Sequence, residues 1–242
     1  MKRAVIIGAT SGIGREVAKK LLDEGWRIGV AGRREEELKT LQALSPGRVS
    51  IQTLDVTRED APARLQQLIG QTGGMDLFLL TSGIGRQNTE LQPETELRTV
   101  ETNALGFTRM VTEAFRYFRE RKGGHLAVIS SVAGTRGLGA APSYSATKRF
   151  QNTYIEALAQ LAHMEKLPVR FTDIRPGFVA THLLDGSKRY PMLMQPERVA
   201  AQIVRALKRG RRIAVIDRRY AWLVFFWRLI PSRLWVRMTL RT

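Results

Sequence analysis

The sequence of 242 residues contains no cysteine and only three histidines, His125, His163 and His182, which lie far apart in the chain. The lack of cysteine excludes disulfides, thiolate metal sites and a cysteine nucleophile, and scattered histidines do not predict a metal site. No uninterrupted apolar run reaches the roughly 18 residues of a membrane-spanning helix. The apolar run in the basic start, MKRAVIIGAT, is too short for a signal peptide and is typical of a buried strand. These absences predict a cytoplasmic protein without a metal.

Acidic residues are also scarce, since 22 Asp and Glu stand against 39 Lys and Arg and leave a net charge of +17. The imbalance is steepest near the end, because from Arg205 onward there are eleven basic residues and a single acid, Asp217. The hydrophobic share of 43% is sufficient for a core. The basic C-terminal tail therefore requires an explanation separate from that of the fold.

Short apolar runs alternate with amphipathic stretches along most of the chain. Predicted strands occupy residues 3–8, 27–32, 49–56, 76–81, 125–130, 169–174 and 212–216, and predicted helices occupy residues 13–24, 34–44, 58–69, 95–119, 143–163 and 196–208. The strands are almost continuous in Val, Ile and Leu, as in parallel strands covered on both faces. This pattern predicts an α/β fold, a doubly wound parallel sheet with helices on both faces. No linker divides it, so we expect one domain at residues 1–217 and a tail at 218–242.

A glycine-rich turn, GATSGIG, follows the first predicted strand. Gly8 permits a tight exit from the strand, Gly12 lets the backbone approach a ligand, and Gly14 lets the helix pack on the strand. The helix N-terminus would then face an anion such as a phosphate. A tight turn without a ligand is the alternative. The position at the first strand–helix junction favours a Rossmann-type dinucleotide site.

The end of the second predicted strand, VAGRR, bears on which dinucleotide is bound. NAD-binding folds place an acidic residue there for the ribose 2′-hydroxyl, whereas an arginine accommodates the 2′-phosphate of NADP. Here Gly32 is followed by Arg33 and Arg34, and a guanidinium binds phosphate through charge-assisted bonds. NADP is favoured, with Arg33 preferred to Arg34, and a solvated helix start is the alternative. Asp55, after the third strand, would accept a bond from the adenine amine or cap the next helix.

The stretch SYSATK places Tyr144 and Lys148 four residues apart, on one face of a predicted helix. Ser131 precedes Tyr144 by thirteen residues, Asn103 lies in the long helix, and RPGFVAT follows the sixth strand. With the GxxxGxG turn, this order of motifs resembles the compact branch of the short-chain dehydrogenase/reductase family, over roughly residues 3–216. Singly, each residue also has a structural explanation: a turn serine, a helix-surface amide, or a helix cap at Thr181. Together they favour the resemblance.

The resemblance implies an oxidoreductase that interconverts a carbonyl and an alcohol with NADP(H), with Tyr144 as the acid–base. A free phenol has a pKa of about 10, which the Lys148 ammonium and the charged nicotinamide would lower. Ser131 rather than Ser130 would hold the substrate oxygen, Asn103 would hold a water in a relay to Lys148, and Lys148 would also bind the nicotinamide ribose. The implied catalytic residues are Ser131, Tyr144, Lys148 and Asn103, and the implied cofactor-binding residues are Gly8, Thr10, Ser11, Gly12, Ile13, Gly14, Arg33, Arg34, Asp55, Val56, Gly83, Asn103, Tyr144, Lys148, Pro176, Gly177 and Thr181.

One stretch departs from the family pattern. After the fourth predicted strand the family usually has Asn-Asn-Ala-Gly, and this chain has Leu80, Thr81, Ser82 and Gly83. Gly83 still lets the backbone pass close to the cofactor. Thr81 and Ser82 would replace part of the hydrogen bonding of the missing amides, so the change affects local bonds more than the reaction.

Two further segments bear on substrate and partners. The segment after Thr181 predicts a lipophilic small-molecule substrate under a covering loop, or a loop that packs on its own protein, because it holds Leu183, Leu184, Tyr190, Met192, Leu193 and Met194. The tail holds three of the four tryptophans among arginines. Such a tail suits an anionic membrane surface, which would make the protein peripheral, or a neighbouring subunit, and nucleic acid less well. The resemblance implies a homo-oligomer, a dimer or a tetramer.

A function of another class also fits the composition. A non-catalytic NADP(H)-sensing or scaffold protein would bind the dinucleotide and use the basic tail for a membrane or a partner. Such a protein has no need of an acid–base. The intact set of Ser131, Tyr144 and Lys148 therefore favours the enzyme.

Overall fold

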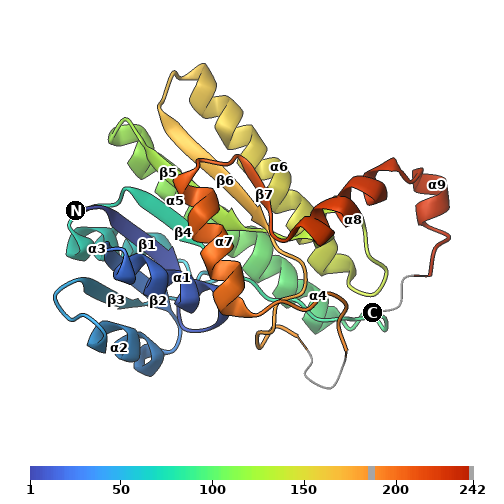
Figure 1. The fold of residues 1–242 in the computed structure, drawn as a ribbon, viewed down its shortest axis with the longest axis horizontal. Helices are drawn as coiled ribbons and strands as arrows, with labels where there is room; N and C mark the ends of the chain where they lie inside the picture. Colours follow the sequence, from blue (N-terminus) through green and yellow to red (C-terminus); the bar gives the residue numbers. More distant parts are fainter. Residues whose placement is uncertain (185–188, 240–242) are drawn as a thin grey trace.

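The computed structural model describes residues 1–184 and 189–239. Within these residues, the centre is a sheet of seven parallel strands in the order β3-β2-β1-β4-β5-β6-β7 (Figure 1). The strands are β1 (Arg3–Ile7), β2 (Arg27–Gly32), β3 (Val49–Thr53), β4 (Leu77–Leu80), β5 (Gly124–Ile129), β6 (Val169–Arg175) and β7 (Ile213–Val215). The strand order reverses between β1 and β4, where open parallel sheets bind ligands beyond the carboxyl ends of their strands. The predicted doubly wound parallel sheet is confirmed.

Helices cover both faces of this sheet. On one face, α1 (Gly12–Asp23), α2 (Glu35–Ala43) and α7 (Pro196–Lys208) share an apolar cluster with strand residues such as Ile6. On the other face, α3 (Ala61–Thr72), α5 (Phe107–Glu120) and α6 (Pro142–Met164) share a second cluster with strand residues such as Val5. Neighbouring residues of β1 thus enter opposite clusters, which explains why the strand is apolar throughout.

The helix expected at residues 95–119 is not continuous. It is divided into α4 (Pro93–Val100), a π-helical turn (Glu101–Gly106) and α5. Asn103 in this turn is fully buried, and Gly106 lies against Val56, where a Cβ would come within 2.8 Å of a methyl group. Periodicity did not reveal the turn because each flanking segment keeps ordinary helical spacing.

The tail begins immediately after the last strand. Asp217 has a positive φ of 74° and accepts a hydrogen bond from the Arg219 amide in the first turn of α8. Two helices follow, α8 (Arg218–Leu229) and α9 (Ser232–Trp235), with Pro231 between them. They project from one end of the sheet layers (Figure 1). Among the helices of residues 1–184 and 189–239, none is both long and apolar enough to cross a membrane.

Candidate active site

Most of the predicted site residues gather along the carboxyl edge of the sheet. Gly8 follows β1, Gly83 follows β4, Ser131 follows β5 and Pro176 follows β6. These four strands are adjacent and parallel, so their ends lie side by side. Helix α6 packs against the turn after β5 and supplies the tyrosine and lysine of the SYSATK stretch.

Lys148 is buried, with 4% of its surface exposed. Its ammonium donates hydrogen bonds to the Ile129 carbonyl (3.1 Å) and to the Gln151 side-chain oxygen (3.0 Å), which use two of its three N–H groups. Burial lowers the pKa of Lys148 to about 8, and the Asp173 carboxylate opposes that shift. The lysine is therefore held in a fixed position and titrates closer to neutrality than a solvated lysine.

Tyr144 lies one turn before Lys148 on α6 and is half-buried. The Lys148 ammonium stands 5.7 Å from the centroid of its ring. Burial raises the pKa of Tyr144, and a hydrogen bond with Ser131 lowers it by less. Among the protein groups, desolvation of the phenolate has the larger effect on this pKa, and its lowering by Lys148 together with the charged nicotinamide stays a prediction. Gly85, which sequence reasoning missed, packs on this ring, and a Cβ there would lie 2.3 Å from a ring carbon.

Two adjacent serines after β5 have different surroundings. Ser131 begins a short 3₁₀ turn, and its hydroxyl accepts a bond from the Ala133 amide at 3.0 Å. The turn explanation of this serine is therefore correct, and the same hydroxyl is also near enough to Tyr144 to lower the pKa of its phenol. Ser130 instead donates to Asp173 inside a buried polar cluster. The structure places Ser131 beside the tyrosine, and Ser130 faces away from it.

Asn103 is fully buried, so it is not a helix-surface amide. Its side chain accepts a bond from the Ile84 amide (2.9 Å) and donates to the Ile84 carbonyl (2.7 Å). Its backbone carbonyl accepts a bond from the Gln151 side-chain amide (2.8 Å), whose oxygen in turn binds Lys148. A glutamine side chain thus connects the Asn103 backbone with Lys148, and the water relay that the resemblance implies stays a prediction. Sequence reasoning missed Gln151. The sequence shows a polar residue three positions after Lys148, but its burial is visible only in the fold.

The glycine-rich turn connects β1 to α1. Gly8 has a φ of +92°, and a Cβ on Gly14 would lie 2.4 Å from both the Gly8 carbonyl and the Thr81 hydroxyl. The Thr81 hydroxyl lies 2.9 Å from the carbonyls of Ile7 and Gly8, so it provides part of the bonding expected of the missing amides. Ser11 at the N-cap of α1 makes no side-chain capping bond, and the first turn has no acidic residue. The N–H groups of that turn and the helix dipole are suited to a phosphate.

The end of β2 meets the same turn. A Cβ on Gly32 would lie 2.6 Å from the Thr10 methyl, so a carboxylate side chain at this position would collide with Thr10. Arg34 donates to the Thr10 hydroxyl at 3.0 Å. The Arg33 side chain is 63% exposed and lies 4.0 Å from the Asp55 carboxylate. Both guanidinium groups follow β2, and it is Arg34, the second choice from the sequence, that contacts the turn.

Asp55 does not cap the next helix. Its carboxylate accepts bonds from the Thr57 amide (3.0 Å) and the Thr57 hydroxyl (2.9 Å), and Asp60 occupies the N-cap position of α3. Val56 beside it is buried against the π-helical turn. Contacts of Asp55 and Val56 with an adenine remain predictions.

The residues after β6 form the opposite side of the site. The Pro176 carbonyl accepts bonds from the Val132 amide (3.1 Å) and, at longer range, from the Ser131 hydroxyl (3.4 Å). Thr181 stands beside Gly12 of the glycine-rich turn, where a Cβ would lie 3.0 Å from its methyl. Thr181 does not cap a helix, because the next helix within the described residues is α7. The threonine therefore approaches the phosphate end of the expected cofactor site.

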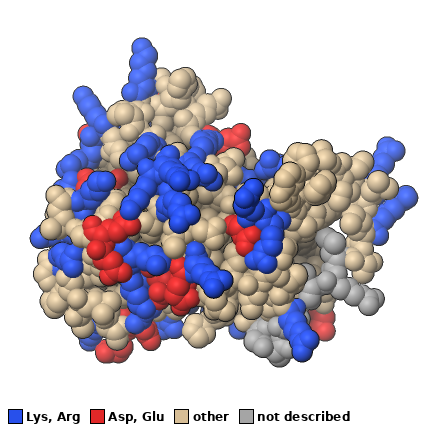
Figure 2. Space-filling view, in the orientation of Figure 1, with Lys and Arg blue, Asp and Glu red and all other residues tan. Residues whose placement is uncertain are grey.

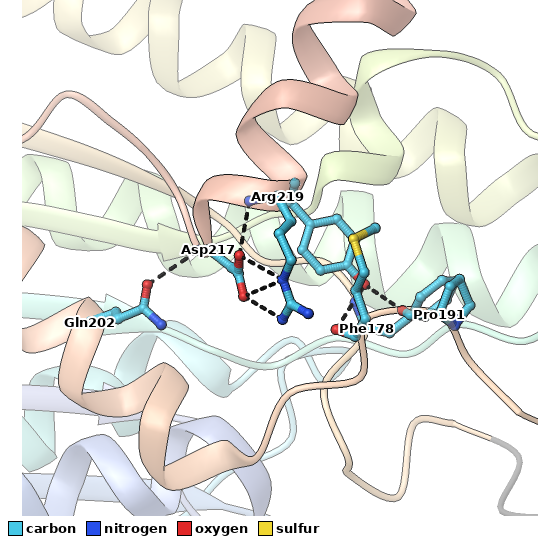
Figure 3. A network of polar contacts seen from close by, with 7 residues as sticks. Phe178, Pro191, Gln202, Asp217 and Arg219 are labelled. Carbon is cyan, nitrogen blue, oxygen red and sulfur yellow. Dashed lines mark hydrogen bonds and ion pairs between the residues drawn. The ribbon is translucent and has the colours of Figure 1, made fainter.

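Tyr220, in the first turn of α8, joins the tail to this region. Its ring covers Gly177, where a Cβ would lie 2.0 Å from a ring carbon. Its hydroxyl accepts a bond from the Phe178 amide (3.0 Å) and donates to the Pro191 carbonyl (2.9 Å). These two partners lie close together in Figure 3. Sequence reasoning missed Tyr220 because its partners are 29 and 42 residues away in the chain. The first turn of α8 is therefore part of the wall behind the nicotinamide side of the expected site.

The covering segment after Thr181 divides into packed and exposed residues, while residues 185–188 lie outside the described part. Met192 and Met194 pack on the core, as the self-packing alternative predicts. Leu183 and Leu193 are 39% and 44% exposed. A cavity of about 430 Å³ lies between this segment and the glycine-rich turn, and it does not reach Ser131, Tyr144 or Lys148.

These features define a class of protein: a parallel-sheet fold of the nucleotide-binding type that brings a serine, a tyrosine and a lysine together at the carboxyl ends of its strands. A sequence model described as short chain dehydrogenase matches residues 2–190. The chain belongs to the short-chain dehydrogenase family and is an oxidoreductase.

Relatives in sequence are consistent with this assignment. An uncharacterized oxidoreductase from Myxococcus xanthus (strain DK1622) is 35% identical over 217 residues, which cover 86% of this chain and 85% of the relative. An uncharacterized oxidoreductase from Staphylococcus aureus (strain USA300) is 29% identical over 219 residues, which cover 88% of this chain and 94% of the relative.

Solved structures share the fold. A 3-ketoacyl-(acyl-carrier-protein) reductase from Brucella melitensis, complexed with NADH, has a TM-score of 0.79 at 22% identity and covers 89% of this chain and 96% of its own. A serine dehydrogenase complexed with NADP⁺ has a TM-score of 0.76 at 22% identity and covers 88% of this chain and 94% of its own. Because one neighbour holds NADH and the other NADP⁺, the cofactor preference of this chain depends on its own residues.

Proposed function

We propose that the protein interconverts a carbonyl and an alcohol on a lipophilic small molecule, with NADP(H) as its cofactor. The observation that carries this proposal is the buried Lys148 ammonium 5.7 Å from the centroid of the Tyr144 ring, with Ser131 near enough to the phenol to lower its pKa. A buried ammonium beside a phenol costs stability unless it is compensated. Proton transfer is a use that accounts for an ammonium and a phenol held together in this position.

The chain's own residues handle the proton and the substrate oxygen, and the nicotinamide, when bound, supplies or takes up the hydride. Because burial raises the pKa of Tyr144, its phenol is protonated at neutral pH and is suited to donate to the oxygen of a carbonyl. Ser131, bonded to the same hydroxyl, holds that oxygen in place. Lys148, fixed by Ile129 and Gln151, stabilises the resulting phenolate and binds the ribose hydroxyls.

Three features after β2 support NADP over NAD. Thr10 fills the space that an acidic side chain at Gly32 would occupy. Arg34 already donates to the Thr10 hydroxyl at the edge of the glycine-rich turn. The Arg33 guanidinium is exposed and stands 4.0 Å from the Asp55 carboxylate, so it remains accessible to a ligand. Two guanidinium groups after β2, with no carboxylate at residue 32 to repel it, would favour binding of the 2′-phosphate of NADP.

A lipophilic substrate is supported by the covering segment. Leu183 and Leu193 expose apolar surface on the segment that follows Thr181. Ligand sites are lined mainly by apolar side chains, with a few polar groups that fix orientation. Ser131 and Tyr144 would supply the polar groups, so we expect activity to rise with the chain length of a ketone or aldehyde.

Cofactor titration tests the first half of the proposal. NADPH and NADH are titrated against the protein by quenching of tryptophan fluorescence, with Arg33→Ala and Arg34→Ala as variants. Exposed Arg116 on α5, paired with Glu113, provides the matched control Arg116→Ala. We expect NADPH to bind at least tenfold more tightly than NADH. This preference for NADPH should become smaller in Arg33→Ala and Arg34→Ala and stay unchanged in Arg116→Ala. Equal binding of both dinucleotides would overturn the NADP assignment.

A carbonyl screen tests the second half. NADPH oxidation is followed with aldehydes and ketones of increasing chain length, for the wild type and for Tyr144→Phe. Turnover that the variant lacks supports the enzyme. Tight NADPH binding without turnover of any carbonyl would favour the non-catalytic NADP(H)-sensing or scaffold alternative.

A further inference from the structure

Helix α8 and the residues after it carry an uncovered apolar surface. We define this aromatic tail surface as Trp222, Phe225, Phe226, Leu229, Leu234, Val236 and Met238, of which each is between 44% and 78% exposed. The first four follow the i, i+3, i+4, i+7 spacing of one helix face. Trp222, Phe225 and Phe226 contact one another, with ring centroids 5.5–6.3 Å apart. The surface is therefore contiguous over α8.

The opposite face of α8 is already packed on the body of the protein. Tyr220 and Val224 are buried in the same cluster as α1 and α7. The Trp235 indole donates to the Gly137 carbonyl at 2.7 Å, and Arg136 donates to the backbone carbonyl of Trp227 at 3.1 Å. The tail thus has a buried side of its own, and the exposed aromatics are not a core face that failed to pack.

The charges around this surface have a single sign. From Arg218 to the end the chain has no acidic residue and six arginines. Arg218, Arg228, Arg233 and Arg237 are exposed. In Figure 2 the projecting α8–α9 segment is largely uncharged, with basic side chains at its outer end. An apolar face bordered by basic groups complements an apolar layer bordered by anions.

We propose that the aromatic tail surface binds the surface of an anionic lipid bilayer. Aromatic rings partition into the interfacial region of a bilayer, and arginines beside them bind anionic headgroups. A second copy of this chain is a poorer occupant, because two such surfaces would bring arginines of like charge together on molecules of net charge +17. The inference is independent of the proposed reaction, since no residue of this surface belongs to the site.

Vesicle binding by the full-length protein tests the proposal. Co-sedimentation is measured with vesicles of phosphatidylcholine alone and of phosphatidylcholine with phosphatidylglycerol. The apolar variant is Phe225→Ser with Phe226→Ser, and the charge variant is Arg228→Gln with Arg233→Gln. The matched control is Leu97→Ser with Met164→Ser, two residues that are 69% and 71% exposed away from the tail. Circular dichroism and thermal unfolding establish that each variant is folded.

The expected result is binding to the anionic vesicles at least tenfold stronger than to the neutral ones. Both tail variants should weaken that binding at least tenfold, and the control should leave it unchanged. Absence of binding to anionic vesicles would overturn the proposal, as would binding that survives the apolar variant. Self-association that is lost in the apolar variant, without vesicle binding, would assign the surface to a second copy. Oligonucleotide binding lost in the charge variant, again without vesicle binding, would assign it to nucleic acid.

Discussion

The site around α6 and the tail around α8 use the same kinds of side chain in opposite ways. In the site, Lys148 is buried and Tyr144 is half-buried, so each has a shifted pKa, and the Lys148 ammonium is fixed by hydrogen bonds. In the tail, arginines and aromatic rings remain exposed. Groups removed from water gain specific chemistry at the cost of stability, whereas exposed groups keep their intrinsic properties and are available to an external surface. Substitutions should therefore have large and specific effects in the first region and small effects on folding in the second.

The largest effect is expected at Tyr144. Tyr144→Phe removes the hydroxyl that moves the proton, so kcat should fall by about 10²–10⁴-fold, the range for general acid–base catalysis. NADPH binding, measured by fluorescence, should stay within twofold. Tyr154→Phe is the matched control, because Tyr154 lies on the same helix and its hydroxyl is hydrogen-bonded to exposed Thr112 of α5. Equal losses in both variants would show that the effect arises from folding rather than proton transfer.

The second prediction concerns the pH dependence of stability caused by Lys148. Its folded pKa of about 8 lies below the ordinary 10.5, so between these values the unfolded chain binds more protons than the folded one. Stability should therefore rise with pH across this window, by up to about 3 kcal/mol. Lys148→Met should lack this rise in urea unfolding followed at pH 7.5 to 10.5. A parallel pH dependence in wild type and variant would show that other groups cause it.

Gln151 gives the third prediction and separates positioning from packing. Gln151→Leu removes the bonds to the Lys148 ammonium and to the Asn103 carbonyl, and a bond to a charged group is worth about 1.5–3 kcal/mol. We expect kcat to fall about tenfold with little change in the KM for NADPH. Gln151→Glu should instead raise the Lys148 pKa and shift the alkaline limb of the pH–rate profile upward. An unchanged profile in Gln151→Glu would show that Gln151 does not act through the lysine.

These residues also mark the limit of prediction from sequence. The sheet, the order of its elements and the grouping of Ser131, Tyr144 and Lys148 were predictable, because apolar periodicity and short motifs are local signals. The Gln151 bridge and the Gly85 contact were not, because each depends on which distant segment lies opposite. The pairing of Asn103 with the Ile84 backbone was not predictable for the same reason.

Electrostatics showed the same limit at single residues. The motif could not show that burial by the protein raises the pKa of Tyr144, because burial is not visible in a four-residue spacing. The choice between Arg33 and Arg34 likewise depended on side-chain direction, and only Arg34 reaches Thr10. Residue type and order can be read from the sequence, whereas solvent exposure and direction require the fold.

The fourth prediction tests how firmly the tail is attached. Arg136 donates to the carbonyl of Trp227, to that of Arg228 (3.2 Å) and to the Ser232 hydroxyl (3.2 Å). Arg136→Ala should loosen α8 and α9 locally, by about 1–2 kcal/mol, without unfolding the sheet. Limited proteolysis should then cut within residues 218–239 several-fold faster, at an unchanged global unfolding midpoint. Arg149→Ala, an exposed arginine of α6, serves as the control.

The smallest effect on the stability of the fold is expected from substitutions on the aromatic tail surface. Phe225 is 52% exposed, whereas Tyr220, five residues earlier on the same helix, is 2% exposed and bonds to Phe178 and Pro191. Phe225→Ser should change the free energy of unfolding by no more than about 0.5 kcal/mol, as for other exposed positions. Tyr220→Ala should cost about 3–5 kcal/mol, because it leaves a cavity against Gly177 and unpaired backbone groups. The free energy of unfolding of both variants is measured by chemical denaturation. If Phe225→Ser lowered it nearly as much as Tyr220→Ala, protein would have to cover the outer face of α8 in solution. The contrast between a buried site and an exposed tail would then not hold.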